Sequence, residues 1–227
     1  MNKQTIDYVF KAKSDNSLEF IGDFESLYKN EEDPWDQSGK GATGNYYKIS
    51  RDRLNEKLTE LKFNSLTEIG CGLGYTTNYI KKSLPDSNVT GIDISHTAIS
   101  KAKQFFPDLN FKQANVCSED FLDHVKPMST DILILNQLLW YILEDLDVCM
   151  TNCYHSLKEG GSLIFSQALL KEKQRYGREI INGYDGLVNY LNNEACDLFT
   201  LQSKNLYQSK DTAFNDALIV LTKNPIR

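Results

Sequence analysis

The sequence is poor in the features that mark several classes of protein. Its 227 residues include 5 prolines and 13 glycines, too few for a collagenous or low-complexity chain. No apolar run approaches the ~20 residues that a membrane-spanning helix needs, and residues 1–17 lack the apolar segment of a signal peptide. We therefore expect a cytoplasmic globular protein that has no membrane partner.

An excess of basic residues is also absent. The chain has 25 lysines and arginines against 31 aspartates and glutamates, a formal charge of -6, and no stretch concentrates its positive charge. Nucleic acids are bound largely through such positive charge, so we expect no nucleic-acid partner. Hydrophobic residues make up 41% of the chain, which is enough for one α/β folding unit of this length.

Cysteine is scarce and irregularly placed. The five cysteines are odd in number and form no C-x-x-C pair, which argues against a disulfide framework and a zinc cage. Cys149, Cys153 and His155 together could be metal ligands. However, Cys149 and Cys153 fall on the apolar stripe of a predicted helix, where a free cysteine packs as a small hydrophobe. We therefore predict no metal site.

The character of the chain changes near residue 64. Before that point, apolar residues recur at helical spacing in two stretches: Phe20, Ile21, Phe24, Leu27 and Tyr28, and then Tyr47, Leu54, Leu58 and Leu61. The sequence therefore predicts an N-terminal helical cap over residues 1–64, within the same folding unit as a core over residues 65–227.

From Ser65 onward, short apolar runs alternate with helical stretches, as in βαβ units. Strands are predicted at 65–69, 88–92, 110–114, 130–135 and 162–167. Gly160 and Gly161 are expected to end the helix that precedes the fifth strand. A helix over 184–194 and extended runs at 198–207 and 216–222 follow. The pattern predicts an α/β fold with a seven-stranded, mostly parallel sheet that has an antiparallel strand at its edge.

A glycine-rich turn follows the first of these strands. It reads Glu68-x-Gly70-x-Gly72-x-Gly74, and Asp93 ends the next strand, at the distance where a carboxylate meets ribose hydroxyls. Tyr75 stands where a dinucleotide fingerprint has its third glycine. Glu68 would repel a pyrophosphate but attract a cation. A ligand with a ribose, an adenine and a cationic end fits this pattern better than a dinucleotide.

With these residues the sequence resembles class I S-adenosylmethionine-dependent methyltransferases. Further matching segments are 113–116, 131–136 and 157–164. The resemblance implies a Rossmann-like fold and S-adenosylmethionine as cofactor, with S-adenosylhomocysteine as product. It also implies these roles: Gly70, Gly72 and Gly74 give access to the methionine part, Glu68 assists its ammonium, Asp93 holds the ribose, Ile94 packs on the adenine, Asn115 and Val116 bound the adenine edge, and Asn136 opens onto the transfer site. The family usually has an acid at position 115.

Residues 33–36, 46–51 and 136–143 are loosely similar to nodulation N-methyltransferases, which act on saccharide amines. This similarity implies a lid over the cofactor. Trp35, Tyr46 and Tyr47 are the predicted lid residues, and Tyr47 also contacts the cofactor. Anchoring of the N-terminal helices to the core is the alternative role for these aromatic residues.

The acceptor is expected at the strand ends and in the insertion after the fifth strand. Lys40 could meet an anionic acceptor, and Gln137, Tyr141, Gln167 and Tyr184 could contact any acceptor, with Gln137 and Tyr141 as weak catalytic candidates. The three histidines, His96, His124 and His155, are not offered as a general base. Orientation alone can drive transfer to a neutral amine or an ionised oxygen.

The predicted function is therefore methyl transfer to nitrogen or oxygen of a small polar metabolite. A saccharide, a nucleotide-linked sugar or a phosphorylated molecule is the expected acceptor, and the protein is expected to be a monomer or homodimer. The alternatives are an NAD-dependent oxidoreductase on a related fold and a non-catalytic cofactor-binding protein.

Overall fold

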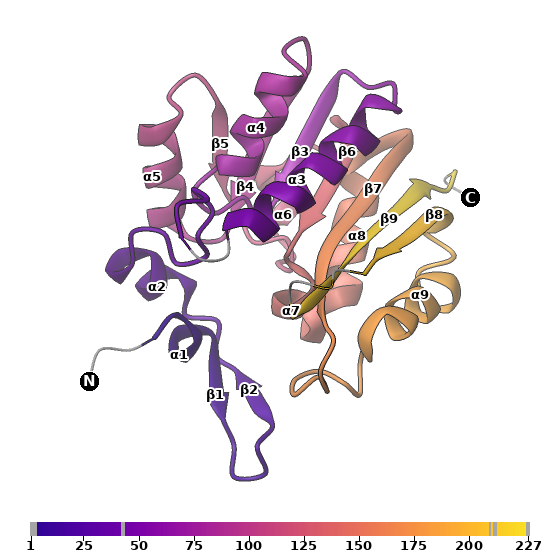
Figure 1. The fold of residues 1–227 in the computed structure, drawn as a ribbon. Helices are drawn as coiled ribbons and strands as arrows, with labels where there is room; N and C mark the ends of the chain where they lie inside the picture. Colours follow the sequence, from indigo (N-terminus) through magenta and orange to yellow (C-terminus); the bar gives the residue numbers. More distant parts are fainter. Residues whose placement is uncertain (1–3, 42–43, 209, 211–212, 226–227) are drawn as a thin grey trace.

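The centre of the molecule is a seven-stranded sheet with the order β5-β4-β3-β6-β7-β9-β8 (Figure 1). The structure is a computed structural model that describes residues 4–41, 44–208, 210 and 213–225. Strand β9 runs antiparallel to both of its neighbours, and the other strand pairs are parallel. The strands are β3 (Ser65–Ile69), β4 (Asn88–Asp93), β5 (Asn110–Gln113), β6 (Thr130–Asn136), β7 (Leu157–Leu170), β8 (Phe199–Tyr207) and β9 (Phe214–Lys223).

Successive side chains of β6 point to opposite faces of the sheet, and apolar residues lie on both faces. Ile132 and Ile134 pack in one cluster with helices α3 (Gly44–Thr59) and α4 (Tyr75–Ser83). Leu133 and Leu135 pack in another cluster on the opposite face. That face is covered by α7 (Leu139–Ile142), a 3-10 turn η1 (Leu143–Asp145), α8 (Leu146–Ser156) and α9 (Gly183–Asn193). Helices α5 (His96–Phe105) and α6 (Phe121–His124) complete the α/β core.

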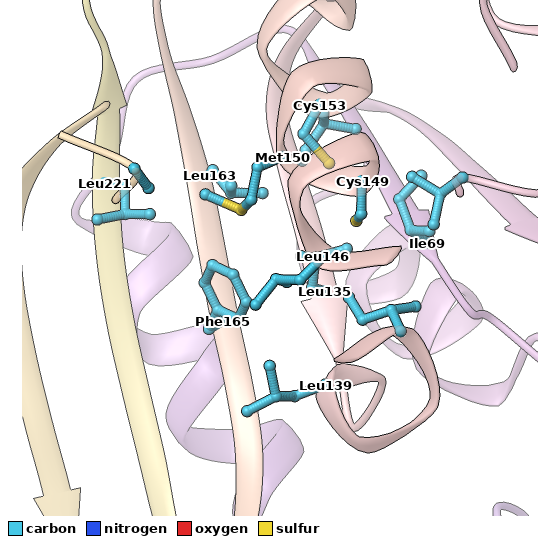
Figure 2. Close-up of a cluster of buried hydrophobic side chains, with 14 of the residues drawn as sticks. Ile69, Leu135, Leu139, Leu146, Cys149, Met150, Cys153, Leu163, Phe165 and Leu221 are labelled. Carbon is cyan, nitrogen blue, oxygen red and sulfur yellow. The ribbon is translucent and has the colours of Figure 1, made fainter. Parts of the chain in front are cut away.

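Helix α8 shows how the sequence pattern becomes a core (Figure 2). Leu146, Cys149, Met150 and Cys153 lie at helical spacing and are at most 3% exposed. They meet Phe165 and other apolar side chains of the sheet in the same cluster. The expected packing role of Cys149 and Cys153 is confirmed, and the described part of the chain contains no group of three His, Cys, Asp or Glu side chains that could hold a metal.

The N-terminal region is only partly helical, which corrects the expectation for residues 1–64. Two helices, α1 (Thr5–Val9) and α2 (Phe24–Asn30), flank a hairpin of β1 (Phe10–Ala12) and β2 (Leu18–Phe20) that projects from the core (Figure 1). Phe20 lies on β2, because the chain turns at Gly22, with φ of +65°, and α2 begins only after its cap, Asp23. The helical spacing from Phe24 onward is correct. That residues 1–64 belong to the same folding unit as the core stays a prediction.

Helix α2 is tied to the core through one carboxylate. Glu25 accepts hydrogen bonds from Ser95 Oγ at 2.7 Å, Thr97 Oγ1 at 2.7 Å and Thr97 N at 3.1 Å. The bond from the Thr97 hydroxyl is the main cause that lowers the pKa of Glu25 to about 2. Glu25 also lies at the N-terminal end of α5, where a negative charge is favourable. The N-terminal segment is thereby anchored beside the carboxyl end of β4.

The sequence suggested that Gly160 and Gly161 end the helix before the fifth strand, and this prediction is wrong. Helix α8 already ends at Ser156, and both glycines lie inside β7. The pairing of β7 with β6 shifts register there, between Thr130 and Ile132. Gly160 has φ of +70°, and a Cβ on Gly161 would lie 3.0 Å from the carbonyl oxygen of Asp131. The glycines therefore accommodate a bulge within a strand.

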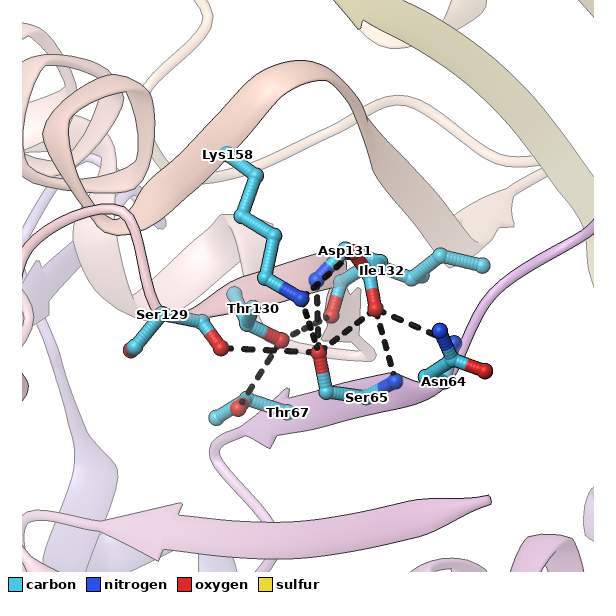
Figure 3. A network of polar contacts seen from close by, with 8 residues as sticks. All are labelled: Asn64, Ser65, Thr67, Ser129, Thr130, Asp131, Ile132 and Lys158. Atoms are coloured by element: carbon cyan, nitrogen blue, oxygen red, sulfur yellow. Dashed lines mark hydrogen bonds and ion pairs between the residues drawn. The ribbon is translucent and has the colours of Figure 1, made fainter. Parts of the chain in front are cut away.

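A polar network joins three strands at the amino end of the sheet (Figure 3). Asp131 of β6 accepts hydrogen bonds from Asn64 N, Ser65 N and Ser65 Oγ, and it pairs with Lys158 at 2.7 Å. Burial opposes ionisation here, but the bonds from Lys158 and Ser65 lower the pKa of Asp131 to about 2. The network lies at the end of the sheet opposite to Asp93 and Asn136, which makes it a structural contact.

The other predictions of the core are confirmed. All five predicted parallel strands, the helix near 184–194 and both C-terminal strands are present, with bounds that differ by a few residues. The antiparallel strand β9 lies one place inside the edge, between β7 and β8. None of the helices in the described ranges combines the length and apolar character needed to cross a membrane.

Candidate functional site

A cavity of about 260 Å³ opens at the carboxyl ends of β3, β4 and β6. Gly70, Asp93 and Asn136, which end or follow these strands, all line it. In open parallel sheets, ligands bind at this edge, where the chain connections diverge to opposite sides. β3 and β6 are such neighbours, because the chain proceeds from β3 toward β4 and β5 on one side and returns to β6 on the other.

The glycines of the turn after β3 have different roles. Each has a positive φ, of 75° at Gly70, 53° at Gly72 and 80° at Gly74. Gly70 lines the cavity, whereas Gly72 and Gly74 do not, and their neighbours leave no room for a side chain. A Cβ on Gly72 would lie 2.5 Å from Tyr28 Oη, and one on Gly74 would lie 2.6 Å from Phe111 Cζ. The turn thus needs glycine for backbone conformation and close packing as well as for access to a ligand.

Asp93 is a buried carboxylate at the wall of the cavity. Its Oδ2 accepts a hydrogen bond from Gly72 N at 2.8 Å, and its Oδ1 accepts one from Ser95 N at 2.9 Å. Burial raises the pKa of Asp93 to about 6, although these backbone hydrogen bonds lower it. The adjacent Ile94 also lines the cavity and is 46% exposed. A fixed acid therefore lies beside an apolar surface that is open to a ligand.

Glu68 lies one layer behind the cavity wall. It is 1% exposed, and its oxygens accept hydrogen bonds from Thr77 Oγ1 at 2.5 Å and from Asn136 Nδ2 at 3.1 Å. Burial raises the pKa of Glu68 to about 7, although both hydrogen bonds lower it. Asn136 and Thr76 stand between this carboxyl group and the cavity, which both of them line.

Asn115 and Val116 reach the cavity from the loop after β5. Asn115 Oδ1 accepts a hydrogen bond from Cys117 N at 3.0 Å, so the side chain shapes its own turn. Val116 is 5% exposed and presents an apolar edge. With Ala114 they form the wall next to Asp93 and Ile94.

The structure brings some of the predicted lid and acceptor residues to the cavity and leaves others away from it. Trp35, Tyr47, Gln137 and Tyr141 line the cavity. Tyr46 lies behind Gln137, whose Nε2 donates a hydrogen bond to Tyr46 Oη at 3.3 Å.

Three predicted acceptor residues point elsewhere. Gln167 is 1% exposed, and its Oε1 accepts a hydrogen bond from Leu139 N at 2.9 Å, so it supports α7. Tyr184 on α9 packs against the large core cluster. Lys40 is exposed and borders a separate shallow depression. The three histidines are also absent from the lining of this cavity, all of them within the described ranges.

Arg51 is a site residue whose role the sequence reasoning missed. It lines the cavity from α3, and its Nε and Nη2 donate hydrogen bonds to the carbonyl oxygens of Tyr47, at 3.1 Å, and Gln37, at 3.0 Å. In the described part of the chain it has no carboxylate partner, and it is the only lysine or arginine that lines the cavity. Its position one helical turn after Tyr47 is the signal that could have identified it.

Aromatic residues of the N-terminal region form the remaining wall. Phe20, Phe24 and Trp35 surround Tyr141, with ring centroids 6.3, 5.3 and 5.7 Å from its ring. All four line the cavity, as does Tyr28. Burial raises the pKa of Tyr141 well above its usual value, so its hydroxyl stays protonated. This hydroxyl makes no hydrogen bond within the residues that the structure describes.

Comparisons with known proteins find similarity to methyltransferases. Residues 67–163 match a family model described as a methyltransferase domain. The chain is 31% identical over 114 residues to trans-aconitate 2-methyltransferase of Afipia carboxidovorans, and 30% identical over 115 residues to malonyl-[acyl-carrier protein] O-methyltransferase of Bacillus cereus. Each alignment covers 50% of this chain, but only 42% and 40% of those enzymes, so the chain spans less than half of their length.

A solved structure shares the fold over most of its length. The N-methyltransferase NodS of Bradyrhizobium japonicum WM9, in complex with S-adenosyl-L-homocysteine, superposes with a TM-score of 0.66 at 16% identity. The superposition covers 88% of this chain and 98% of NodS. The predicted Rossmann-like fold and the predicted resemblance are confirmed.

Proposed function

We propose that this chain, which carries a methyltransferase domain of the S-adenosylmethionine-dependent class, transfers the methyl group of that cofactor to nitrogen or oxygen of a small polar acceptor. One observation carries the proposal. The buried Asp93, the exposed Ile94 and Arg51, whose guanidinium has no carboxylate partner among the described residues, line one cavity at the carboxyl end of a sheet of this fold. The methyltransferase match favours this function over the alternative of an NAD-dependent oxidoreductase.

The residues present fit the adenosine half of the cofactor. Asp93 would accept hydrogen bonds from the ribose hydroxyls, as the resemblance implies, while Ile94 provides an apolar surface for the adenine. Val116 and Asn115 would bound the adenine edge. Because Asp93 is held by two backbone N–H groups, its carboxylate needs no reorientation to receive the ribose.

The charges around the cavity also fit the methionine half. Arg51 lacks a carboxylate partner in the described residues, and it would pair with the cofactor's carboxylate. Asn136 uses Nδ2 to donate to Glu68, which leaves Oδ1 to accept a hydrogen bond from the cofactor's ammonium. The negative charge of Glu68 behind Asn136 would stabilise that ammonium. Glu68 would thus assist the ammonium, as the resemblance implies, by acting through Asn136.

When bound, S-adenosylmethionine supplies a methyl group on a positively charged sulfur that leaves as a neutral thioether. The chain contributes position and the exclusion of water. The aromatic wall of Phe20, Phe24, Trp35 and Tyr141 covers the side of the cavity next to Gln137. No histidine lines this cavity within the described residues, so an acceptor that is already a neutral amine or an ionised oxygen fits best.

The charge of the lining narrows the predicted acceptor classes. A phosphate or several carboxylates on the acceptor would need cations, and Arg51 is the only lysine or arginine in the described lining. Lys40, the residue predicted to meet an anionic acceptor, borders a different depression. Among the predicted acceptors, a saccharide without phosphate, and an amino sugar in particular, is therefore favoured over a phosphorylated molecule.

Two measurements test the proposal. Titration calorimetry should show binding of S-adenosylmethionine and S-adenosylhomocysteine, with no preference for NAD, and an Asp93→Ala variant should lose most of this affinity. Transfer of a radiolabelled methyl group should then be measured to amino sugars, nucleotide-linked sugars, phosphorylated metabolites and trans-aconitate. A preference for NAD would refute the enzyme class, and preferred methylation of trans-aconitate or a phosphorylated molecule would refute the acceptor class.

A further inference from the structure

One face of α3 is held by a single buried carboxylate. Tyr46, Ser50 and Arg53 are spaced by four and three residues, so they lie on the same side of the helix. Tyr46 Oη and Ser50 Oγ donate hydrogen bonds to Asp216 Oδ1 at 3.1 and 3.2 Å, and Arg53 Nη1 contacts Asp216 Oδ2 at 3.1 Å. Asp216 lies on β9 and is 3% exposed. It does not line the cavity.

The neighbouring face of the same helix forms part of the cavity wall. Tyr47 and Arg51, each one position further along the helix than Tyr46 and Ser50, line the cavity. Arg51 Nε donates to the carbonyl oxygen of Tyr47, so the two residues are held together within one helical turn. Because a helix moves as a rigid body, the contacts of Asp216 with one face determine where the other face lies.

A second path leads from Asp216 to the cavity through Gln137. Gln137 Oε1 accepts a hydrogen bond from Ala168 N at 2.7 Å, and its Nε2 lies 3.3 Å from Tyr46 Oη and 3.4 Å from Ser50 Oγ. Since a backbone N–H can only donate, the amide orientation is determined. The Tyr46 hydroxyl donates its hydrogen bond to the carboxylate of Asp216, so its oxygen can accept one from Gln137 Nε2.

The backbone of Gln137 makes this support necessary. Gln137 has φ of +58°, a strained conformation for a residue with a Cβ, which persists only where the surroundings enforce it. Gln137 also lines the cavity beside the aromatic wall. Its side chain is therefore held in one orientation by Ala168 on one side and by Tyr46 and Ser50 on the other.

We propose that Asp216 is a positioning residue: it holds α3 so that Arg51 and Tyr47 close over the amino-acid end of the cofactor, and it orients Gln137 through Tyr46. This inference rests on the proposed function, because it takes Arg51 as the partner of the cofactor's carboxylate. It predicts that loss of Asp216 weakens binding of the amino-acid end and leaves binding of the nucleoside end nearly unchanged.

Two probes separate these ends. S-adenosylhomocysteine carries the amino acid, whereas 5′-methylthioadenosine has the same nucleoside and sulfur without it. By titration calorimetry, Asp216→Ala should weaken S-adenosylhomocysteine binding about tenfold and methylthioadenosine binding less than about threefold. A tenfold change is within the usual range for energetic coupling between a distant residue and a binding site. Asp216→Asn keeps one acceptor oxygen and should recover part of the loss. The double variant Tyr46→Phe, Ser50→Ala removes two donors to Asp216, keeps its ion pair with Arg53 and should reproduce the selective effect.

Asp131→Asn is the matched control, since Asp131 is an ion-paired aspartate of the same sheet at its opposite end. It should lower stability and leave the ratio of the two affinities unchanged. If the wild-type protein binds neither probe, the proposed function fails. If it binds both and the Asp216 and Tyr46/Ser50 variants weaken the two probes equally, or not at all, the inference about Asp216 is overturned. Should Asp216→Ala not fold, the double variant decides.

Discussion

Replacing Glu68 by glutamine should make the protein more stable at neutral and alkaline pH. The carboxyl group is 1% exposed, and burial raises its pKa from 4.5 to about 7. Between these two values the folded protein binds a proton that the unfolded chain does not bind. The contribution of Glu68 to stability is therefore fully present below pH 4.5, and it is lost as the pH rises through 7.

The magnitude follows from the same pKa values. A rise from 4.5 to about 7 corresponds to about 3 kcal/mol of stability lost across this interval. Glutamine can keep both contacts, because its Oε1 can accept from Asn136 Nδ2 while its Nε2 donates to Thr77 Oγ1. The Glu68→Gln variant lacks the titrating group, so it should gain up to about 3 kcal/mol over the wild type at pH 8 and nearly nothing at pH 4.5.

The assay is urea denaturation of both proteins at several pH values between 4.5 and 8.5. The quantity of interest is the difference between their unfolding free energies, because groups such as Asp93, whose pKa is raised to about 6 by burial, titrate in both proteins. A difference that does not change with pH would show that Glu68 is not destabilised by burial. The same variant should bind S-adenosylhomocysteine more weakly at pH 8, where the wild type supplies a negative charge behind Asn136.

Three further predictions concern other parts of the molecule. Arg51→Met should weaken S-adenosylhomocysteine binding by about 1.5–3 kcal/mol, the contribution of a hydrogen bond to a charged group, and hardly affect methylthioadenosine binding. Equal losses for both ligands in calorimetry would contradict the pairing of Arg51 with the cofactor's carboxylate. Gly74→Ala should lower the melting temperature more than Gly160→Ala. Both glycines have a positive φ, but of the two only Gly74 has no room for a Cβ, which would lie 2.6 Å from Phe111. Equal shifts in calorimetric scans would argue against packing as the reason. Asp131→Asn should lower the free energy of unfolding by about 1 kcal/mol above pH 4, since solvent screens the partly exposed pair with Lys158. The loss should shrink as the pH falls toward 2, because a lowered pKa gives stability that protonation of the carboxylate removes. Denaturation curves that show a constant loss down to pH 2 would exclude the ion pair as its source.

Much of the core could be predicted because its signals are local. Each strand of the sheet is a short apolar run with two faces, and each glycine of the turn after β3 lies where the backbone needs a positive φ. Asp93 follows at a distance set by one βαβ unit. These patterns depend on residues less than about 30 positions apart, so the sequence alone displays them.

The N-terminal hairpin and the role of Gly160 show where local patterns fail. Phe20 has helical spacing to Phe24, but the hairpin places it against Tyr141, 121 residues away in the chain. Gly160 follows a helix, as a C-terminal glycine would, but it serves a bulge that exists only because β7 pairs with β6. In both cases the deciding partner is distant in sequence, and helical periodicity carries no information about it.

The sequence by itself therefore determined the α/β class, the seven strands, the glycine-rich turn and the acid of the neighbouring strand, since these follow from periodicity and backbone conformation. Only the tertiary structure decided that Glu68 lies behind Asn136, that Arg51 faces the cavity without a carboxylate partner in the described residues, and that Asp216 holds α3. Strand order decides the last of these. Because β9 inserts beside β7, a carboxylate more than 160 residues from its partners Tyr46, Ser50 and Arg53 is buried against α3, where a hydrogen-bonded charge has strong and specific effects.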